Sequence, residues 1–508
     1  MLSIGAVRSS MAAASYFAQD NYYARHEEGP SQWFGAAAGK LGLQGEVQAE
    51  RFRQLLEGRI DAETQLGRVV AGERQHLHGW DLTFSAPKSV SLAALVGGDE
   101  RLIQGHDHAV REVLGWLEDQ AIVTRSRENG IVAEQDGQGM VAAVFRHDLS
   151  RAGEPQLHSH AVVMNATLTN DDTWRSLHSI HLYKLGKEAG ERYQQELARR
   201  AVELGYPIVP NRNGTFELDG IPRELALTFS SRAKAVEEKL AERGLTRATA
   251  TGEQREDAAL RSRPSKPEID RANQRQQDRR TARQAGVDLE RFVATARRNQ
   301  ERNAVQEAAR DRSPTQPAER DGPRDPAGRA TGNQPTMQPS PPGPANDAAL
   351  RAVREAAEIL SERDAAFTGR ELEQRARVLS LGEASAREID QAVRQLADQG
   401  ELAERMVLAI DGATKKHTLQ PGWTTRELIA TEGSMLHHER QGRDAVMPLM
   451  NRPAAVFLVR ETRTIAAEHG FAWTDGQIEA TVGILAATSR VIGVQGYAGT
   501  AKTTTVLA

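Results

Sequence analysis

The 508-residue sequence contains no cysteine. This absence excludes disulfides, thiolate metal sites and cysteine nucleophiles, and it is typical of proteins from a reducing compartment. The sequence also lacks any run of about eighteen apolar residues, the length that a membrane-spanning helix requires, and its first residues, MLSIGAVRSS, lack the apolar core of a signal peptide. We therefore expect a cytoplasmic protein without membrane insertion, in which His, Asp or Glu holds any metal.

Neither sign of charge dominates the sequence. The formal net charge of -4 argues against a uniformly basic protein that coats DNA, but the 65 Lys and Arg residues can still gather on one surface. Nucleic-acid binding therefore stays open. The length is too great for one hydrophobic core and predicts about two to four domains.

The first 230 residues mix strand-like runs with helical segments, a pattern typical of an α+β fold. The clearest strand candidates are residues 80–84, 141–147 and 157–165. From about residue 232 the chain becomes helical and rich in Arg, Gln and Glu, and we take residues 1–300 as the first domain. Residues 301–346, rich in Pro and Gly, have the composition of a disordered linker.

Residues 347–430 have the pattern of two capped helices followed by a hairpin. Thr368 with Glu371 and Ser385 with Glu388 have the spacing of capping boxes. This order predicts a small winged-helix-like module, and an arbitrary α/β spacer is an equal alternative. Residues 431–508 are interpreted as the start of a P-loop α/β domain, with a strand at 491–495.

Three histidines form the strongest candidate metal site. His158 and His160 stand two apart in a strand-like run, so both side chains lie on one face. His147 ends the preceding strand, and an antiparallel return would bring it beside them. Three neutral imidazoles leave coordination positions open, as a catalytic metal requires. The alternative is that they are surface or core histidines, as we interpret His106, His108, His437 and His438.

Tyrosine is scarce, with seven in the chain, yet Tyr16, Tyr22 and Tyr23 fall within eight positions. A tyrosine in a helix usually packs as an amphipathic side chain. A phenol has a pKa near 10, so it needs a base or a metal to act as a nucleophile. The histidine site could supply that help.

Asp81 lies on the same strand face as Thr83. Its carboxylate could accept the second ring N–H of a metal-binding histidine, or it could receive a phenolic proton. The alternative is an exposed aspartate at a strand edge.

Together these residues resemble the MobF family of conjugative relaxases, the TrwC/TraI type of HUH endonuclease. The resemblance rests on MLSIGAVRSS, AASYFAQDNYY, LTFSAPKSVS and FRHDLSRAGEPQLHSHAVVMNAT. It implies an antiparallel-sheet palm with helical fingers. It also implies site- and strand-specific nicking of plasmid transfer-origin DNA through a 5′-phosphotyrosine link, followed by strand transfer.

The resemblance assigns a role to each candidate residue. Tyr16 matches the nucleophile of the first cleavage and Tyr22 that of the second transfer, with Tyr23 a weaker candidate. Asp81 matches the acidic residue beside the metal. The metal ligands would be His147, His158 and His160, and the ion would be divalent, Mg²⁺ or Mn²⁺ in cells.

The same resemblance implies partners. They are transfer-origin DNA, as a hairpin plus single strand at the nick site, relaxosome accessory proteins and a type IV secretion coupling protein. The protein would act in the cytoplasm of the donor cell and could travel to the recipient with the DNA. A rolling-circle replication initiator is the enzyme alternative. A non-catalytic DNA-binding module, with tyrosines stacked on bases, is the other.

The last residues predict a nucleotide site. GYAGTAKT follows the P-loop pattern except that Ala501 replaces its second glycine. ATP with Mg²⁺ is the expected ligand of a complete domain. Because the sequence stops soon after the lysine, we expect no ATP-driven unwinding. The nucleotide-binding candidates are Gly496, Gly499, Lys502, Thr503 and, by resemblance to superfamily 1 helicases, Gln477.

Overall fold

The computed structural model describes residues 1–7, 9, 31–128, 131–150, 152–246, 249–251, 254, 271–310, 347–410, 416–468, 470 and 472–495. The chain divides into two compact units. The first comprises Met1–Ile359, Thr368–Leu396 and Leu408–Gln420, and the second comprises Leu360–Phe367, Ala397–Val407 and Pro421–Ala508. Among the helices of these described residues, none has the length and apolar character needed to cross a membrane.

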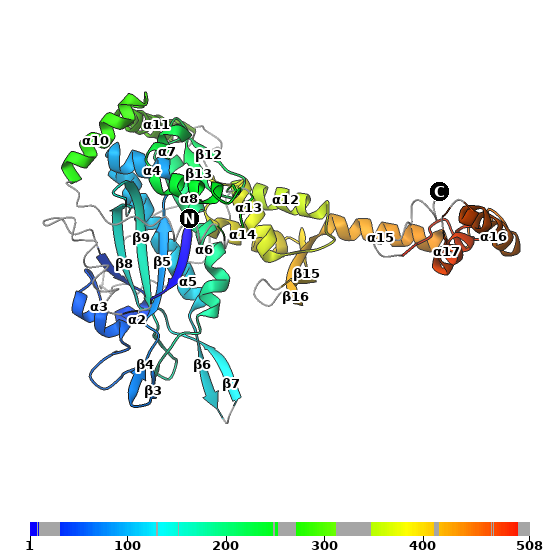
Figure 1. The fold of residues 1–508 in the computed structure, drawn as a ribbon, viewed down its shortest axis with the longest axis horizontal. Coiled ribbons are helices and arrows are strands. Elements are labelled where there is room, and N and C mark those ends of the chain that lie inside the picture. Colours follow the sequence, from blue (N-terminus) through cyan, green and yellow to red (C-terminus); the bar gives the residue numbers. More distant parts are fainter. Residues whose placement is uncertain are drawn as a thin grey trace, which may run out of the picture. The chain divides into compact units, whose positions relative to one another are not determined.

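A five-stranded antiparallel sheet lies at the centre of the first unit (Figure 1). Its order is β1-β5-β9-β8-β2, so the strand that carries two of the candidate histidines is central. The predicted α+β class with an antiparallel sheet is confirmed, and the three predicted strands are β5, β8 and β9. The strands are β1 (Leu2–Ala6), β2 (Ser31–Phe34), β5 (Gly79–Ser85), β8 (Ala142–Leu149) and β9 (Pro155–Met164).

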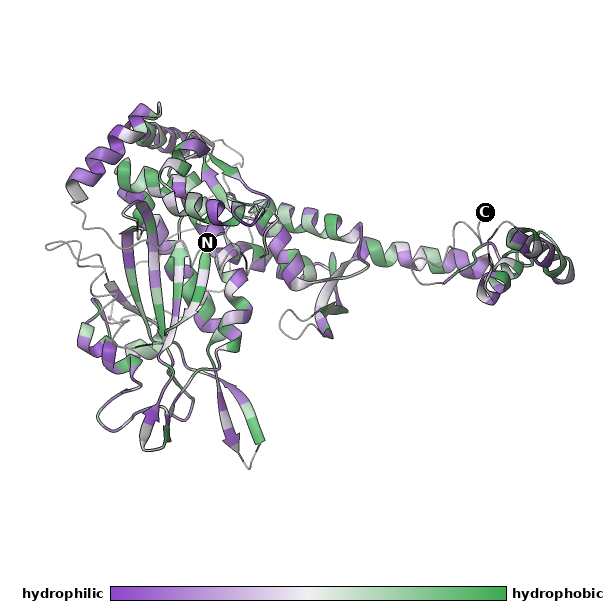
Figure 2. Ribbon diagram, in the orientation of Figure 1, coloured by the Kyte–Doolittle hydropathy of each residue, from purple (hydrophilic) through white to green (hydrophobic). Residues whose placement is uncertain are grey.

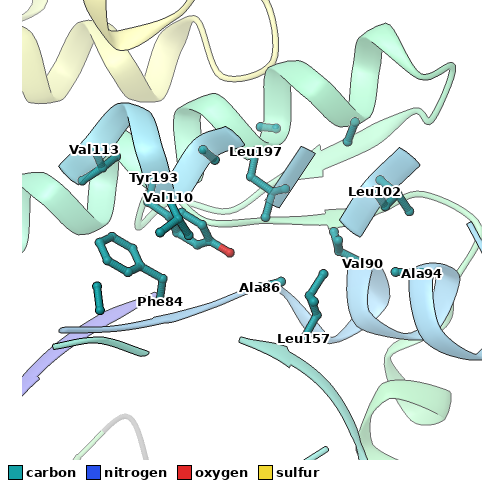
Figure 3. Close-up of a cluster of buried hydrophobic side chains, with 14 of the residues drawn as sticks. Phe84, Ala86, Val90, Ala94, Leu102, Val110, Val113, Leu157, Tyr193 and Leu197 are labelled. Atoms are coloured by element: carbon teal, nitrogen blue, oxygen red, sulfur yellow. The ribbon is translucent and has the colours of Figure 1, made fainter. Parts of the chain in front are cut away.

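One face of the sheet packs against two long helices, α5 (Glu100–Ala121) and α6 (Ile180–Glu203). Along β5 the buried side chains alternate with partly exposed ones, which puts Trp80, Leu82 and Phe84 on this face. Figure 3 shows Phe84 beside Tyr193 of α6, in the same cluster as Val110 of α5. Burial of each large side chain contributes about 1.5–3 kcal/mol, so this core fixes the strands that carry the site.

The opposite face is covered in part by α2 (Ala36–Lys40) and α3 (Ala49–Leu56). Phe52 of α3 makes an edge-to-face contact with Phe145 of β8, with ring centroids 5.3 Å apart. Figure 2 shows hydrophobic and hydrophilic colours alternating along the central strands. Residues two apart lie on the same face, so Phe145 and Val162 of this apolar cluster share their face with His147 and His160.

Further strands of this unit form two-stranded hairpins, and five more α-helices of the described residues up to Arg310 belong to it. In Figure 1 the β3–β4 and β6–β7 hairpins both project from one end of the sheet. The hairpin strands are β3 (Arg68–Val70), β4 (Glu73–Gln75), β6 (Val123–Glu128), β7 (Ile131–Asp136), β10 (Thr167–Leu168), β11 (Trp174–Arg175), β12 (Ile208–Pro210) and β13 (Phe216–Leu218). The helices are α4 (Lys88–Ser91), α7 (Arg223–Thr228), α8 (Ser231–Ala241), α10 (Arg271–Gln284) and α11 (Leu289–Arg310).

Helix α11 continues to Arg310, so the first residues of the predicted linker 301–346 are helical and the predicted start at 301 was wrong. Residues 301–310 contain Ala, Glu, Gln and Arg, which favour helix, and the first proline of the linker comes only at Pro314. The rest of the predicted linker lies outside the described residues.

Beyond residue 346, helices precede a hairpin in the predicted order. Both predicted capping boxes are present, since the side chains of Thr368 and Ser385 accept from the backbone of Glu371 and Glu388. The winged-helix assignment stays a prediction. The elements are α12 (Asp347–Ser361), β14 (Phe367–Thr368), α13 (Gly369–Leu379), α14 (Ala386–Asp398), β15 (Leu402–Ile410) and β16 (His417–Thr425), with sheet order β14-β16-β15.

The C-terminal part of the second unit is helical, with α15 (Arg426–Gln441), α16 (Arg452–Glu468) and α17 (Asp475–Leu485). The predicted strand at 491–495 was wrong, because these residues form no strand. A buried strand needs a neighbouring strand to satisfy its backbone, and the described residues from 426 to 495 include none. Gly496, Gly499, Ala501, Lys502 and Thr503 lie outside the described residues.

Candidate functional site

The structure brings the three candidate histidines together on one face of the sheet. Strands β8 and β9 pair antiparallel with His147 opposite His158, and His160 follows two residues along β9. The three imidazole centroids lie 5.2 to 5.3 Å from one another. The β8–β9 connection closes through a hydrogen bond from the Ser150 N–H to the Glu154 carbonyl, 2.8 Å long. The antiparallel return therefore places three imidazoles around one point.

A backbone carbonyl orients His158. Its Nδ1 lies 2.8 Å from the carbonyl oxygen of Gln156, and a carbonyl can only accept. The ring therefore carries its proton on Nδ1 and has its lone pair on Nε2. Neutral imidazoles that bind metals are held in this way by a hydrogen bond to the second nitrogen.

The Asp81 carboxylate orients His160 from the neighbouring strand β5. Its two oxygens lie 2.9 and 2.8 Å from Nδ1 of His160. Thr83, which pairs with His160 in the sheet register, places its hydroxyl 3.4 Å from both carboxylate oxygens. The sequence had left two roles open for Asp81, and this geometry is that of an acceptor for the ring N–H.

A buried network lies behind the histidines, on the opposite face of β9. Ser159 stands between His158 and His160, and its hydroxyl lies 2.8 Å from Nε2 of His106 in α5. Nδ1 of His106 lies 2.7 Å from the hydroxyl of Tyr193 in α6. Burial, with smaller contributions from nearby positive charge, lowers the pKa of His106 to about 3, so the ring is neutral at pH 7. This confirms the sequence-based interpretation of His106 as a surface or core histidine, since the ring is buried and both of its nitrogens have partners.

Sequence reasoning did not single out the residues that hold the start of β9. The Lys88 ammonium donates to the Pro155 carbonyl over 2.9 Å, and the Ser91 hydroxyl accepts from the Leu157 N–H over 3.1 Å. Burial lowers the pKa of Lys88 to about 8. The sequence did mark these two residues, since both belong to the APKSVS segment after β5, which is part of the family resemblance.

Several candidates do not join this cluster. Tyr16, Tyr22 and Tyr23 lie outside the described residues. Gln477 lies at the start of α17, where its side-chain oxygen accepts from the backbone N–H of Thr474 over 2.8 Å. His437 and His438 contact each other on α15, with ring centroids 5.9 Å apart.

Three imidazole nitrogens of the site can act as metal ligands, and the Asp81 carboxylate contacts one of the three rings from behind. Three ring nitrogens and no thiolate suit several divalent ions, and such a set leaves coordination positions for oxygen ligands. An arrangement of this kind can hold a Lewis acid against a phosphate oxygen.

The comparisons with known proteins agree on one family. A family model described as TrwC relaxase matches residues 10–285. The chain is 37% identical over 339 residues to the multifunctional conjugation protein TraI of Escherichia coli, and 36% identical to that of strain K12. Each match covers 64% of this chain and 18% of the relative, so the chain spans under a fifth of the length of these curated proteins.

Solved structures give the same result. The conjugative relaxase TrwC in complex with OriT DNA, in its metal-free structure, matches with a TM-score of 0.52 and 36% identity. Its metal-bound structure matches with a TM-score of 0.53 and 36% identity. Both matches cover 57% of this chain and all of the TrwC chain.

Proposed function

The chain belongs to the TrwC relaxase family, and from this premise we propose that it nicks one strand of plasmid transfer-origin DNA by tyrosine transesterification and later rejoins or transfers that strand. The observation that carries the proposal is the convergence of three imidazoles on one face of the sheet. The catalytic part would be residues 1–300.

His147, His158 and His160 are the proposed metal ligands. The donor set supports this assignment, because the hydrogen bonds at Nδ1 put the lone pairs of two of these rings on Nε2. When bound, a divalent ion such as Mg²⁺ or Mn²⁺ would supply Lewis acidity toward the scissile phosphate. A solved structure of the relative TrwC is described as metal-bound, which supports a metal cofactor for this chain.

Tyr16 is the proposed first nucleophile. Its phenolic oxygen forms a bond to phosphorus while the bond from phosphorus to the 3′-oxygen breaks. The phenolic proton passes to water, and the leaving 3′-oxygen takes up a proton to become a free hydroxyl. One phosphodiester replaces another, so the 5′-phosphotyrosine keeps the bond energy needed for rejoining, and Tyr22 would perform the second transfer.

Asp81 is proposed to position His160 through the pair of short contacts to Nδ1. Lys88 and Ser91 are proposed to hold β9 in place at its start, so that both of its histidines keep their register with β8. The partner would be transfer-origin DNA, with a hairpin and a single-stranded nick site. By family resemblance, the further partners would be relaxosome accessory proteins and a type IV secretion coupling protein.

The test is cleavage of supercoiled plasmid that carries a cognate transfer origin. We expect a nicked product with protein attached at its 5′ end, and a nucleotide-bearing Tyr16 peptide in mass spectrometry after digestion. The matched control is Tyr16→Phe, which removes only the nucleophilic oxygen. Cleavage that continues unchanged in Tyr16→Phe or in EDTA would overturn the mechanism.

The same assay separates the alternatives. A replication initiator would cleave plasmid with a replication origin and leave the transfer origin intact. A non-catalytic module would bind the DNA without forming any covalent peptide.

A further inference from the structure

A second group of metal-ligating side chains lies away from β5, β8 and β9. It comprises Glu134 on β7, His178 just before α6, and His181 in the first turn of α6. Their ligand atoms all lie within 4.8 Å of one another. The Glu134 carboxylate oxygens lie 2.8 Å from Nδ1 of His178 and 3.1 Å from Nε2 of His181.

The backbone fixes these three residues relative to one another. The N–H of His178 donates to the carbonyl of Val123 over 2.7 Å, and the Thr124 hydroxyl donates to the Ser176 carbonyl over 2.7 Å. The segment before α6 therefore pairs with β6, and β6 pairs along its length with β7. These bonds hold the base of the β6–β7 hairpin beside the start of the helix.

The hydrogen-bonding capacity of these three side chains is not fully used within the cluster. Nδ1 of His178 is buried, and its short contact to the carboxylate lacks hydrogen-bond geometry, so this nitrogen has no hydrogen-bond partner in the described part of the chain. The Glu134 carboxylate is half exposed, and its two oxygens face the two imidazoles, one oxygen to each ring.

We propose that Glu134, His178 and His181 form a second divalent-metal site, of the zinc class, that clasps the β6–β7 hairpin to α6. Two imidazoles and one carboxylate are a common ligand set for zinc, with bonds of about 2.0–2.1 Å. Ligand atoms around a tetrahedral zinc then lie about 3.3 Å apart, close to the two contacts at Glu134. The side chains are partly exposed, which leaves room for water as the fourth ligand.

The clasp has a mechanical role. The β6–β7 hairpin projects from the body, and Figure 2 shows hydrophobic colour on part of β7, whose first residues Ile131 and Val132 are exposed. A hairpin of two strands is marginally stable by itself. A metal bond at its base would reduce the movement of β7 relative to α6.

The test uses the full chain with His158→Ala and His160→Ala, which disables the sheet site. Zn²⁺ is titrated by equilibrium dialysis, and Co²⁺ is titrated with detection of the visible absorption of four-coordinate cobalt. We expect one tightly bound equivalent of each ion. Adding Glu134→Gln should weaken binding at least about tenfold, and adding His178→Ala to that variant should abolish it.

The matched control is His437→Ala with His438→Ala, which removes two neighbouring imidazoles from α15 and should leave the stoichiometry unchanged. A second measurement is hydrogen exchange of the β6 and β7 amides, which Zn²⁺ should slow in the background protein but not in the Glu134→Gln variant. Failure to bind either ion, or binding that survives Glu134→Gln with His178→Ala, would overturn the proposal. Because the sheet site is disabled throughout, this result is independent of DNA cleavage.

Discussion

Nδ1 of His160 lies 2.9 and 2.8 Å from the two carboxylate oxygens of Asp81. An ionised carboxylate can only accept, so the ring must carry its proton on Nδ1. The contact connects two neighbouring strands, since Asp81 is on β5 and His160 on β9. This contact supports the proposal that Asp81 acts on the metal site through the tautomer and basicity of His160.

The first prediction concerns Asp81→Asn, which keeps an amide oxygen as acceptor but removes the charge. Metal affinity should fall by about 10–100-fold, because the partner of a ligating histidine raises its basicity. Nicking should be lost at low Mn²⁺ and recovered at high Mn²⁺, as measured by plasmid cleavage over a metal titration. Loss of nicking with unchanged metal affinity would instead assign Asp81 as the acceptor of the phenolic proton.

The second prediction separates the two proposed tyrosine steps. Tyr22→Phe should nick supercoiled plasmid at the wild-type rate, because Tyr16 retains its hydroxyl. Transfer of the covalently held strand to a second nick site should fall strongly, as followed with a labelled single-stranded acceptor. Tyr23→Phe is the matched control. If Tyr23→Phe loses strand transfer and Tyr22→Phe keeps it, the two assignments must be exchanged.

The third prediction is a pH dependence that arises at His106. Its pKa is about 3 in the folded protein, against 6.5 as its ordinary value, because the ring is buried. Between these values the unfolded chain binds a proton that the folded chain does not. The neutral ring of His106 therefore makes its full contribution to the free energy of unfolding above pH 6.5. That contribution is lost as the pH falls toward 3, and at pH 5 the free energy of unfolding is lower by about 2 kcal/mol.

Urea unfolding at pH 7 and pH 5 measures this loss. A background of Trp423→Phe and Trp473→Phe confines the tryptophan signal to the first unit. His106→Gln should be less stable at pH 7, but its stability should change less between the two pH values. An equal change in both proteins would contradict a neutral buried His106.

The fourth prediction concerns Ser91→Ala. The buried Leu157 N–H would lose its acceptor, which costs about 1–3 kcal/mol of stability. Metal affinity should fall as well, because β9 loses one of its restraints two residues after its start at Pro155. Ser3→Ala on β1 is an exposed control and should change stability by less than about 0.5 kcal/mol. If the two variants are equally stable, the hydrogen bond between Ser91 and Leu157 does not help to hold β9 in place.

The arrangement of the histidines was accessible from the sequence because it depends on local periodicity. A spacing of two in a strand puts His158 and His160 on one face, and a short polar turn returns the chain beside His147. Asp81 followed from the same alternation on β5. These inferences needed no knowledge of how the helices pack.

Contacts between distant segments were not accessible. Ser159 and His106 are 53 positions apart in sequence, and His106 and Tyr193 are 87 apart. Glu134 and His181, 47 positions apart, gave no motif at all. The strand predicted at 491–495 failed for the same reason, because an apolar run becomes a strand only where a partner strand is present.

Ser159 stands between two imidazoles but belongs to the other side of the sheet, where His106 holds it. A slip of β9 by one residue against β8 would exchange the two faces. The hydroxyl would then enter the histidine cluster, and both rings would be forced into an apolar interior. The contact between Ser159 and His106 therefore favours the correct register of β9 against β8. A chain with the wrong register should bind a divalent ion more weakly, so metal affinity measures whether the sheet has formed in its correct register.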